Sequence, residues 1–205
     1  MSTPGRTGVR LAALGDSLFA GFGLRPEEAL PQVLEDLLRA GGLDVEVLNF
    51  GISGETAGDG LERLHRVLAA KPDGLLVEFG TNDFFLGLPP EEIESALEAI
   101  LGRAEQAGLP CLLVGVRSLP VADPDYCQAF DLIHPRLAER HGVPLLPDIL
   151  ACFMAEKGAE KGAEDDLTLM DGLHPNAAGA RKAAEALLPL ALELAAKIET
   201  RPGPA

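Results

Sequence analysis

Aromatic and basic residues are both scarce in this sequence of 205 residues. It has no tryptophan, one tyrosine and eight phenylalanines, whereas a surface that stacks nucleic-acid bases or sugar rings normally has more aromatic side chains. The 17 lysines and arginines are outnumbered by 32 acidic residues, which gives a formal net charge of −15. Because phosphate binding depends on a basic surface, this balance argues against nucleic acid and anionic membrane surfaces as partners.

Cysteines and long apolar runs are also few. The three cysteines, Cys111, Cys127 and Cys152, are odd in number and have no C-x-x-C spacing, so neither a zinc site nor a disulfide framework is expected. No segment approaches the ~18 apolar residues of a membrane span, and residues 1–10 contain no apolar stretch of secretory type. As written, the chain is expected to be cytoplasmic, or periplasmic if a leader has been removed from it.

Short apolar runs alternate with helical patterns along the chain. The expected strands are residues 9–14, 45–50, 75–79, 111–116 and, more weakly, 143–146. Three of the expected helices are residues 30–40, 126–141 and 177–197. Two more are expected from apolar residues on one face: a helix capped by Thr56 with Leu61, Leu64 and Leu68, and a helix with Ile93, Leu97, Leu101 and Ala104. This alternation predicts an α/β fold, a three-layer α/β/α sandwich around a five-stranded parallel sheet. We expect one domain over residues 1–205, with its core at about residues 9–197 and flexible ends.

Polar residues are grouped where ligands of such a sheet bind, beyond the carboxyl ends of the strands. Three groups follow predicted strands and a fourth follows the long loop after the last strand: Gly15–Ser17, Gly51–Thr56, Gly80–Asp83 and Asp171–Asn176. Each group alone has a structural explanation, as a turn, a helix cap or a hydrogen-bonded loop residue. Together they offer complementary chemical groups at one rim of the sheet.

Ser17, His174 and Asp171 are the residue types of a nucleophile, a general base and a carboxylate that orients the base. A serine hydroxyl needs an adjacent base to act as a nucleophile at neutral pH, and imidazole titrates near that pH. Asp171 precedes His174 closely enough in the sequence for its carboxylate to reach the other ring nitrogen. The Ser17 N–H, the Gly54 N–H and the Asn82 side-chain amide are candidate donors to the oxyanion of a tetrahedral intermediate.

These groups resemble the sequence blocks of the SGNH hydrolase superfamily, also called the GDSL esterases and lipases. Four motifs match in order between residue 11 and about residue 190: Gly15–Leu18, Ser53–Thr56, Gly80–Asp83 and Asp171–Pro175. The connecting segments are similar to those of the small bacterial arylesterase and acyl-CoA thioesterase/lysophospholipase group, as seen in Asn49–Gly54, Val77–Gly80 and Gly142–Leu145.

The resemblance implies a flavodoxin-like sheet, an acyl-enzyme mechanism with a Ser–His–Asp triad, and no metal or other cofactor. It implies that Ser17 is the nucleophile, His174 the base and Asp171 its partner. It further implies that Ser17, Gly54 and Asn82 form the oxyanion hole. The expected function is hydrolysis of the carboxylic ester, or thioester, bonds of short- to medium-chain acyl or aryl esters.

Two apolar segments near this rim are candidates for binding the acyl or aryl group. Phe84, Phe85 and Leu86 follow the third polar group directly, and they either line an acyl groove or close the end of the sheet. The loop after the fourth strand contains Leu119 and Arg117 and is the second candidate wall. Arg117 would meet an anionic headgroup there or form a surface ion pair.

Two further features of the sequence concern the surroundings of this rim. Glu78 interrupts a strand that otherwise reads as buried. Because a buried carboxylate must be paired or hydrogen-bonded, we expect Glu78 to brace the loop around the nucleophile rather than to act in catalysis directly. Lys157–Glu164 repeats Lys-Gly-Ala-Glu and is expected to be either a solvated linker or a mobile flap beside the site.

Other functions stay open at this point. Hydrolysis of acyl-CoA thioesters or lysophospholipids is the main alternative, although the net charge mildly favours small neutral or aryl esters. A metal-dependent phosphoesterase that uses Asp16, Asn82, Asp171 and His174 is a distant alternative, and a non-catalytic flavodoxin-like binding module is another. The expected partner is a small acyl ester, and a homo-oligomer is compatible with the sequence.

Overall fold

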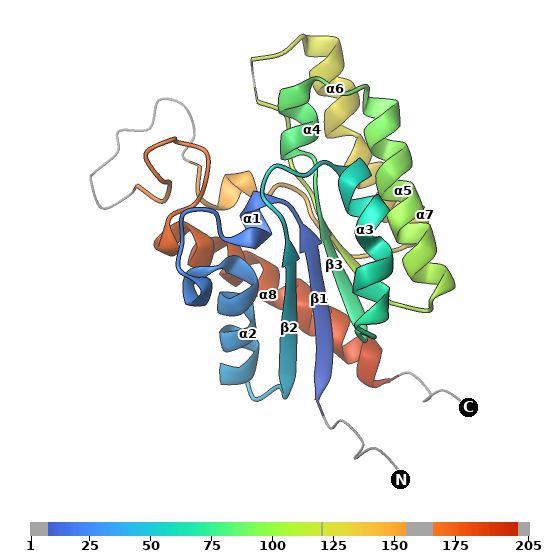
Figure 1. The fold of residues 1–205 in the computed structure, drawn as a ribbon, viewed down its shortest axis with the longest axis vertical. Coiled ribbons are helices and arrows are strands. Elements are labelled where there is room, and N and C mark those ends of the chain that lie inside the picture. The colour runs from blue at the N-terminus through green and yellow to red at the C-terminus, as the bar shows by residue number, and fades with distance from the viewer. Residues whose placement is uncertain (1–7, 120, 155–165, 201–205) are drawn as a thin grey trace.

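Five parallel strands form the central sheet in the order β2-β1-β3-β4-β5 (Figure 1). The computed structural model describes residues 8–119, 121–154 and 166–200. The strands are β1 (Val9–Gly15), β2 (Val45–Gly51), β3 (Gly74–Glu78), β4 (Cys111–Val114) and β5 (Leu145–Leu146). Each predicted strand is present, although β4 and β5 are shorter than the apolar runs that predicted them.

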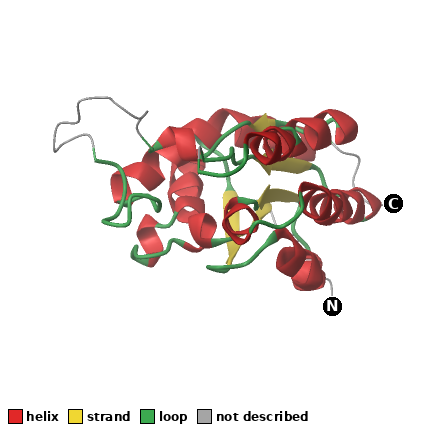
Figure 2. Cartoon of the chain, turned by 90° about the horizontal axis from the view of Figure 1, so that it is seen from above, coloured by secondary structure: helices red, strands yellow, loops and turns green. Residues whose placement is uncertain are grey.

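Helices cover both faces of the sheet, as Figure 2 shows from above. They are α1 (Ser17–Ala20), α2 (Leu30–Ala40), α3 (Ala57–Ala69), α4 (Thr81–Leu86), α5 (Pro90–Gln106), α6 (Pro124–Asp131), α7 (Ile133–His141) and α8 (Ala177–Glu199), with short 3-10 helices η1 (Pro26–Glu28) and η2 (Leu150–Cys152). Helices α2 and α8 pack side by side on one face, and α3, α5 and α7 lie on the other (Figure 1). This arrangement confirms the predicted α/β class.

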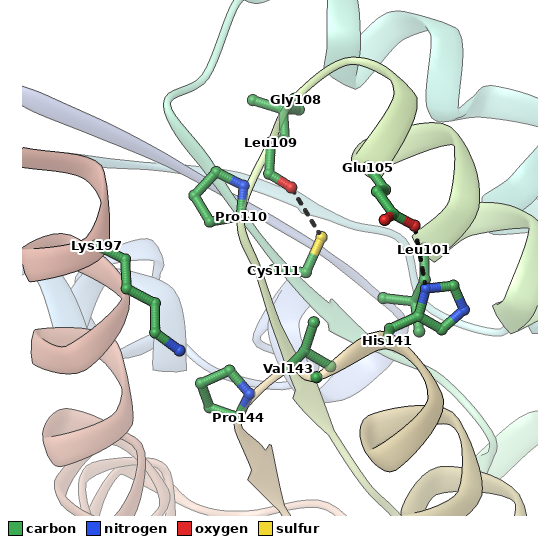
Figure 3. Close-up of a pocket in the computed structure, with 11 residues that line it drawn as sticks. Leu101, Glu105, Gly108, Leu109, Pro110, Cys111, His141, Val143, Pro144 and Lys197 are labelled. Atoms are coloured by element: carbon green, nitrogen blue, oxygen red, sulfur yellow. Dashed lines mark hydrogen bonds and ion pairs between the residues drawn. The ribbon is translucent and has the colours of Figure 1, made fainter. Parts of the chain in front are cut away.

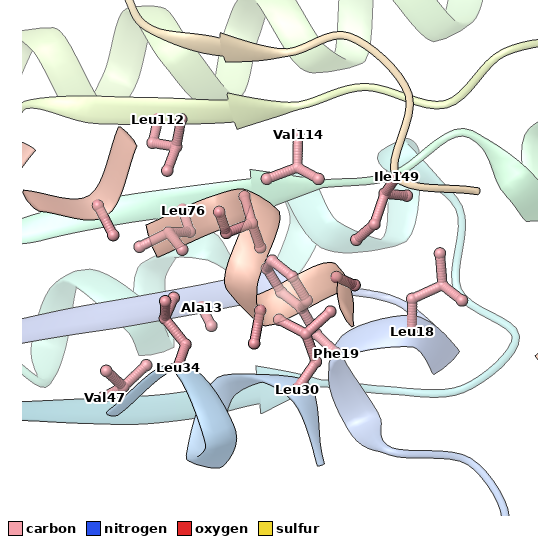
Figure 4. Packing of buried hydrophobic residues seen from close by; sticks show 14 of the residues in the cluster. Ala13, Leu18, Phe19, Leu30, Leu34, Val47, Leu76, Leu112, Val114 and Ile149 are labelled. Atoms are coloured by element: carbon pink, nitrogen blue, oxygen red, sulfur yellow. The ribbon is translucent and has the colours of Figure 1, made fainter. Parts of the chain in front are cut away.

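Side-chain alternation along the strands divides the core into two clusters, one on each face of the sheet. On β1, Leu11 and Ala13 pack toward α2 and α8, while Ala12 and Leu14 pack toward the other helices. Figure 4 shows the first cluster, in which Leu34 of α2 lies near Ala13. Because β3 is buried along its whole length, the sheet is a firm support for the loops at its carboxyl ends.

The prediction of one helix over residues 126–141 is wrong, since α6 and α7 meet at Leu132. Pro135 explains the break. Proline has no N–H, so it cannot donate the hydrogen bond that the Asp131 carbonyl would accept in a continuous helix. The chain therefore starts a new helix at Ile133, with Pro135 in its first turn, where a missing N–H costs least.

Short helices follow two of the strands directly, where the sequence led us to expect loops. α1 begins at Ser17 and α4 begins at Thr81. The segment Phe84–Leu86, which is in none of the predicted helices, is therefore helical. Such short helices have too few apolar positions to produce a visible period, which is why the pattern did not reveal them.

Two remaining expectations concern the surface of the fold. The Lys157–Glu164 repeat lies outside the described residues, so its role as linker or flap stays a prediction. Within the part of the chain that the structure describes, no helix is both long enough and apolar enough to cross a membrane.

Glycine at position 51 allows β2 to lie against the helix that bears Ser17. A Cβ atom at Gly51 would lie 2.2 Å from the backbone nitrogen of Ala20 and 2.6 Å from the carbonyl carbon of Phe19. Both are backbone atoms and cannot rotate away as a side chain would. The close approach of β2 and α1 therefore depends on the absence of a side chain at this position.

We predict that Gly51→Ala lowers the free energy of unfolding by about 1–3 kcal/mol, because the added methyl group overlaps backbone atoms. Gly58→Ala is the matched control, since a Cβ atom at this exposed position of α3 makes an ordinary 3.6 Å contact with Thr56 Oγ1. Alanine is the better helix former, so this control should raise stability by up to about 1 kcal/mol. Chemical denaturation measures both changes. If Gly51→Ala were as stable as the wild type, the close approach of β2 and α1 would be contradicted.

Candidate active site

The loops at the carboxyl ends of the strands bring Ser17, His174 and Asp171 into one hydrogen-bonded chain. Ser17 is the first residue of α1, and its Oγ lies 3.0 Å from His174 Nε2. His174 Nδ1 lies 2.7 Å from Asp171 Oδ2. Ser17 is buried, whereas Asp171 is exposed, so this series of hydrogen bonds runs from the core of the fold to its surface.

The turn that leads to His174 keeps Asp171 ionised. Asp171 Oδ1 accepts hydrogen bonds from the N–H groups of Leu173 at 2.9 Å and of His174 at 3.0 Å. The bond from Leu173, followed by those from His174, lowers the pKa of Asp171 to about 2. Gly172, in the same turn, has a φ of +67°, a backbone conformation that favours glycine. An ionised Asp171 accepts a hydrogen bond from the Nδ1–H of His174. Nε2 of the same ring is then unprotonated and is the acceptor that faces Ser17.

Backbone contacts on both sides of His174 fix its loop. The N–H of Leu169 donates to the His174 carbonyl at 2.7 Å. Thr168 and Pro175 form an isolated antiparallel bridge across the loop. The side chain of Asn176 then caps the first turn of α8. The position of His174 therefore depends on the main chain as well as on its two side-chain hydrogen bonds.

Asp16 connects the turn before Ser17 to Asn82 of α4. Its Oδ1 accepts from the Leu18 N–H at 3.0 Å, which caps α1, and its Oδ2 accepts from Asn82 Nδ2 at 3.0 Å. The Asp16 side chain is fully buried, and this burial raises its pKa to about 6. The two hydrogen bonds make Asp16 the link between the first and third polar groups.

The three expected oxyanion donors lie at this rim but differ in their hydrogen bonding. Both hydrogens of the Asn82 amide have acceptors, namely Asp16 Oδ2 and the Glu55 carbonyl, the latter at 2.8 Å. The N–H groups of Ser17 and Gly54 have no acceptor among the described residues. Gly54 has a φ of +87°, which explains the need for glycine there.

Arg63 of α3 holds the loop that contains Gly54. Its Nε bonds Glu55 Oε2 at 2.5 Å, and its Nη2 donates to the Gly15 carbonyl at 3.1 Å. The loop after β2 is thereby tied to the end of β1. The sequence does not single out Arg63, because it lies in a helix that carries other charged residues.

Two further carboxyl groups are buried beside Asp16. Glu78, the last residue of β3, accepts from the Asp16 N–H at 3.2 Å, as expected for a residue that braces the turn before Ser17. Asp83 accepts from the Ala57 N–H through both oxygens, at 3.1 Å and 3.2 Å, and so joins α4 to α3. Burial raises the pKa of Glu78 and of Asp83.

Phe22 packs against the ring of His174, a contact that was not predicted from the sequence. The two ring centroids are 4.4 Å apart and the ring planes are inclined by 36°. Phe22 is nevertheless 48% exposed. The signal available in the sequence was an aromatic residue placed between Gly21 and Gly23, in a loop with no other reason to carry one.

The residues expected to bind substrate fall into different environments. Phe84 is buried among aromatic side chains of α6, whereas Phe85 and Leu86 are 52% and 65% exposed. Arg117 forms an ion pair at 3.1 Å with a carboxylate of α6, and Leu119 is partly buried against both core clusters. Phe85 and Leu86 are therefore the members of this group that are open to a ligand.

A cavity of about 270 Å³ lies elsewhere on the molecule, beside the amino end of β4 (Figure 3). Its lining includes Leu101, Cys111, His141 and Lys197. The polar groups follow the carboxyl ends of the strands, whereas this cavity lies at the amino ends. The cavity is therefore separate from the candidate site.

The side chains considered for the metal-dependent alternative form hydrogen bonds with one another. Asp16 bonds Asn82, and Asp171 bonds His174. Within residues 8–119, 121–154 and 166–200, no group of three or more His, Cys, Asp and Glu side chains is placed to hold a metal ion.

Comparison with known proteins decides the family. The sequence model of the GDSL-like lipase/acylhydrolase family matches residues 13–182. The chain belongs to this family. It is 35% identical over 176 residues to an arylesterase of Vibrio mimicus, covering 85% of this chain and 84% of that protein. It is 36% identical over 167 residues to thioesterase 1/protease 1/lysophospholipase L1 of Escherichia coli strain K12, covering 81% and 75%.

A solved structure agrees with the GDSL-family assignment. AlinE4, an esterase of the SGNH-hydrolase family, matches with a TM-score of 0.74 and 35% identity, covering 93% of this chain and 98% of that chain. The family, fold and enzyme class predicted from the sequence are thereby confirmed. The chain is an SGNH-type serine esterase.

We predict that Phe22→Ala lowers kcat/KM of this GDSL-family enzyme for a p-nitrophenyl ester about fivefold, because an aromatic contact of this kind contributes about 1 kcal/mol. Thermal stability should change little, since the side chain is half exposed. Leu192→Ala removes a side chain of similar exposure, 45%, from α8 and should leave kcat/KM unchanged. Wild-type kcat/KM in Phe22→Ala would show that the ring does not hold His174.

Proposed function

We propose that this enzyme hydrolyses neutral esters of short- to medium-chain acyl groups, and aryl esters, with Ser17 as nucleophile, His174 as general base and Asp171 as the group that orients the base. The observation that carries the proposal is the hydrogen-bonded chain from Ser17 Oγ to His174 Nε2 (3.0 Å) and from Nδ1 to Asp171 Oδ2 (2.7 Å). Acyl transfer to a serine needs these groups in this order.

In the proposed mechanism, Ser17 Oγ attacks the ester carbonyl carbon as its proton passes to His174 Nε2. The imidazolium is stabilised by ionised Asp171, which stays a carboxylate throughout because its pKa is about 2. The C–O bond to the alcohol then breaks, and His174 gives its proton to the leaving oxygen. A water molecule activated by His174 attacks the acyl-enzyme in the same way, which releases the acid and restores the Ser17 hydroxyl.

The N–H groups of Ser17 and Gly54 and the amide of Asn82 are the proposed oxyanion hole. Two observations support this role: the first two N–H groups have no other acceptor among the described residues, and Asn82 lies on the same rim. The Asn82 hydrogen that faces Asp16 is the one that the oxyanion would share, because the other bonds the Glu55 carbonyl. Loss of one such donor typically lowers kcat by about 10²–10³-fold.

An apolar rim supports an acyl or aryl substrate. Five of the large apolar side chains that are exposed belong to the loops and short helices around Ser17 and His174, namely Phe22, Ile52, Phe85, Leu86 and Met170. Exposed apolar groups gathered at one place favour binding of an apolar ligand. The similarity to an arylesterase of Vibrio mimicus supports the same substrate class.

Thioesters and lysophospholipids form a second candidate substrate class. Support comes from the similar Escherichia coli protein, which is named thioesterase 1/protease 1/lysophospholipase L1. Against acyl-CoA stands the net charge of −15, which gives no electrostatic attraction for a polyanion.

We predict that a fluorophosphonate probe labels Ser17 in the wild type and that Ser17→Ala is not labelled, because the probe reacts with an activated serine hydroxyl. Mass spectrometry of the labelled peptide identifies the modified residue. Ser53→Ala is the control: it removes the serine of the next polar group and should be labelled like the wild type. Undiminished labelling of Ser17→Ala would refute the assignment of the nucleophile.

We also predict that kcat/KM for p-nitrophenyl esters is higher for butyrate and octanoate than for palmitate. Leu86→Ser should lower kcat/KM for octanoate about 3–10-fold and leave acetate unchanged, since only the longer chain covers this side chain. Leu192→Ser on α8 is the control and should affect neither ester. Equal losses for acetate and octanoate would contradict the role of Leu86, and a preference for octanoyl-CoA over the octanoate ester would favour the thioesterase alternative.

A further inference from the structure

A carboxyl group without a part in the proposed chemistry is fully buried next to the residue that precedes Ser17. Glu78 Oε2 accepts from the Asp16 N–H at 3.2 Å, and its Oε1 has no partner among the described residues. A Cβ atom at Gly15, the neighbour of Glu78 across the sheet, would lie 2.7 Å from Glu78 Oε2. The end of β1 is therefore shaped to admit this carboxyl group.

Asp16 connects Glu78 to two groups of the proposed site through hydrogen bonds. The N–H of Asp16 donates to Glu78. Oδ1 of Asp16 caps the helix that begins at Ser17, and Oδ2 accepts from Asn82. We propose that Glu78 is a positioning residue for ester hydrolysis, which acts through Asp16 to set the positions of Ser17 and Asn82. This inference rests on the proposed function, in which both Ser17 and Asn82 contact the reacting ester.

Two other buried carboxyl groups face Glu78, namely Asp16 from the turn after β1 and Asp83 from α4. Burial, followed by the charge of Asp16, raises the pKa of Glu78 well above its ordinary value. Burial also raises the pKa of Asp16, to about 6, although a hydrogen bond with Glu78 lowers it. Burial therefore favours the protonated, neutral form of Glu78.

The basic groups around the pair are engaged elsewhere. Arg63 of α3 is paired with a glutamate of the neighbouring loop at 2.5 Å. His134 of α7 is neutral at pH 7, because burial lowers its pKa to about 4. His174, on the loop before α8, bonds its own carboxylate at 2.7 Å. An ionised Glu78 would add a second buried negative charge near the amide that is proposed to stabilise the oxyanion, which opposes the reaction.

Two substitutions separate the positioning role from simple space filling. Glu78→Gln keeps a neutral side chain and an acceptor for the Asp16 N–H, so kcat for a p-nitrophenyl ester at pH 7 should stay within about threefold of the wild type. Glu78→Met keeps a similar volume but has no oxygen to accept this bond. We expect kcat to fall about 10–100-fold and KM to stay within about threefold, as for a displaced group that acts in the transition state.

The pH dependence of stability tests the neutral state separately. The unfolded chain releases the Glu78 proton as the pH rises past the ordinary value of 4.5, whereas the folded chain releases it at a higher pH because its pKa is raised. Wild-type stability should therefore fall relative to Glu78→Gln as the pH rises above 4.5. The difference in Tm between the two proteins should grow over this range.

A matched control is available in α2. Glu35 is another buried glutamate that accepts from a backbone N–H, that of Val47 at 2.6 Å, but it lies away from the polar rim. Glu35→Gln should keep the wild-type kcat and KM.

Equal losses of kcat in the Gln and Met variants of Glu78, or a wild-type kcat in a folded Met variant, would overturn the inference. If the Met variant does not fold, the Gln variant decides, since a loss of kcat of more than about threefold in Glu78→Gln would also overturn it. A difference in Tm that is constant with pH would refute the neutral state of Glu78. Fluorophosphonate labelling of every variant keeps the two proposals apart. Absence of labelling at Ser17 in the wild type would refute the proposed function, whereas normal labelling with unchanged Glu78 variants would refute only the role of Glu78.

Discussion

Asp16, through its carboxylate and its backbone N–H, joins three segments at the rim of the proposed site. It caps α1 through the Leu18 N–H, it accepts from Asn82 of α4, and its backbone N–H bonds Glu78 at the end of β3. α1 has only four residues, so its own hydrogen bonds are too few to hold it in place. The position of the proposed nucleophile relative to the proposed oxyanion donor therefore depends on one buried anion.

The two halves of the site are held by different physical means. The Ser17 half is fixed by buried carboxyl groups, whose charge is limited because burial raises the pKa of Asp16 and of Glu78. The His174 half lies on an exposed turn, where backbone hydrogen bonds lower the pKa of Asp171 to about 2. The bond between Ser17 Oγ and His174 Nε2 joins the halves, and Phe22 covers the ring beside it.

Much of this was predictable from the sequence, for a definite reason. Parallel strands end at one rim, so the groups that contain Ser17, Asn82 and His174 had to meet once the strands were identified. What the sequence could not show were contacts that depend on burial in three dimensions. Phe84 and Phe85 are adjacent and alike, yet one is in the core and the other is exposed, because a helix that was not predicted turns them to different sides.

A crystal structure of the enzyme inactivated by a phosphonate ester tests the role of the rim most directly, because the adduct imitates the tetrahedral intermediate. The phosphorus should be bonded to Ser17 Oγ, with one phosphonyl oxygen within hydrogen-bond distance of the Ser17 N–H, the Gly54 N–H and Asn82 Nδ2. Asp16 should still accept from Asn82 in the adduct. A phosphonyl oxygen directed away from Asn82, with the amide bonded as before to Asp16 and Glu55 alone, would contradict this account.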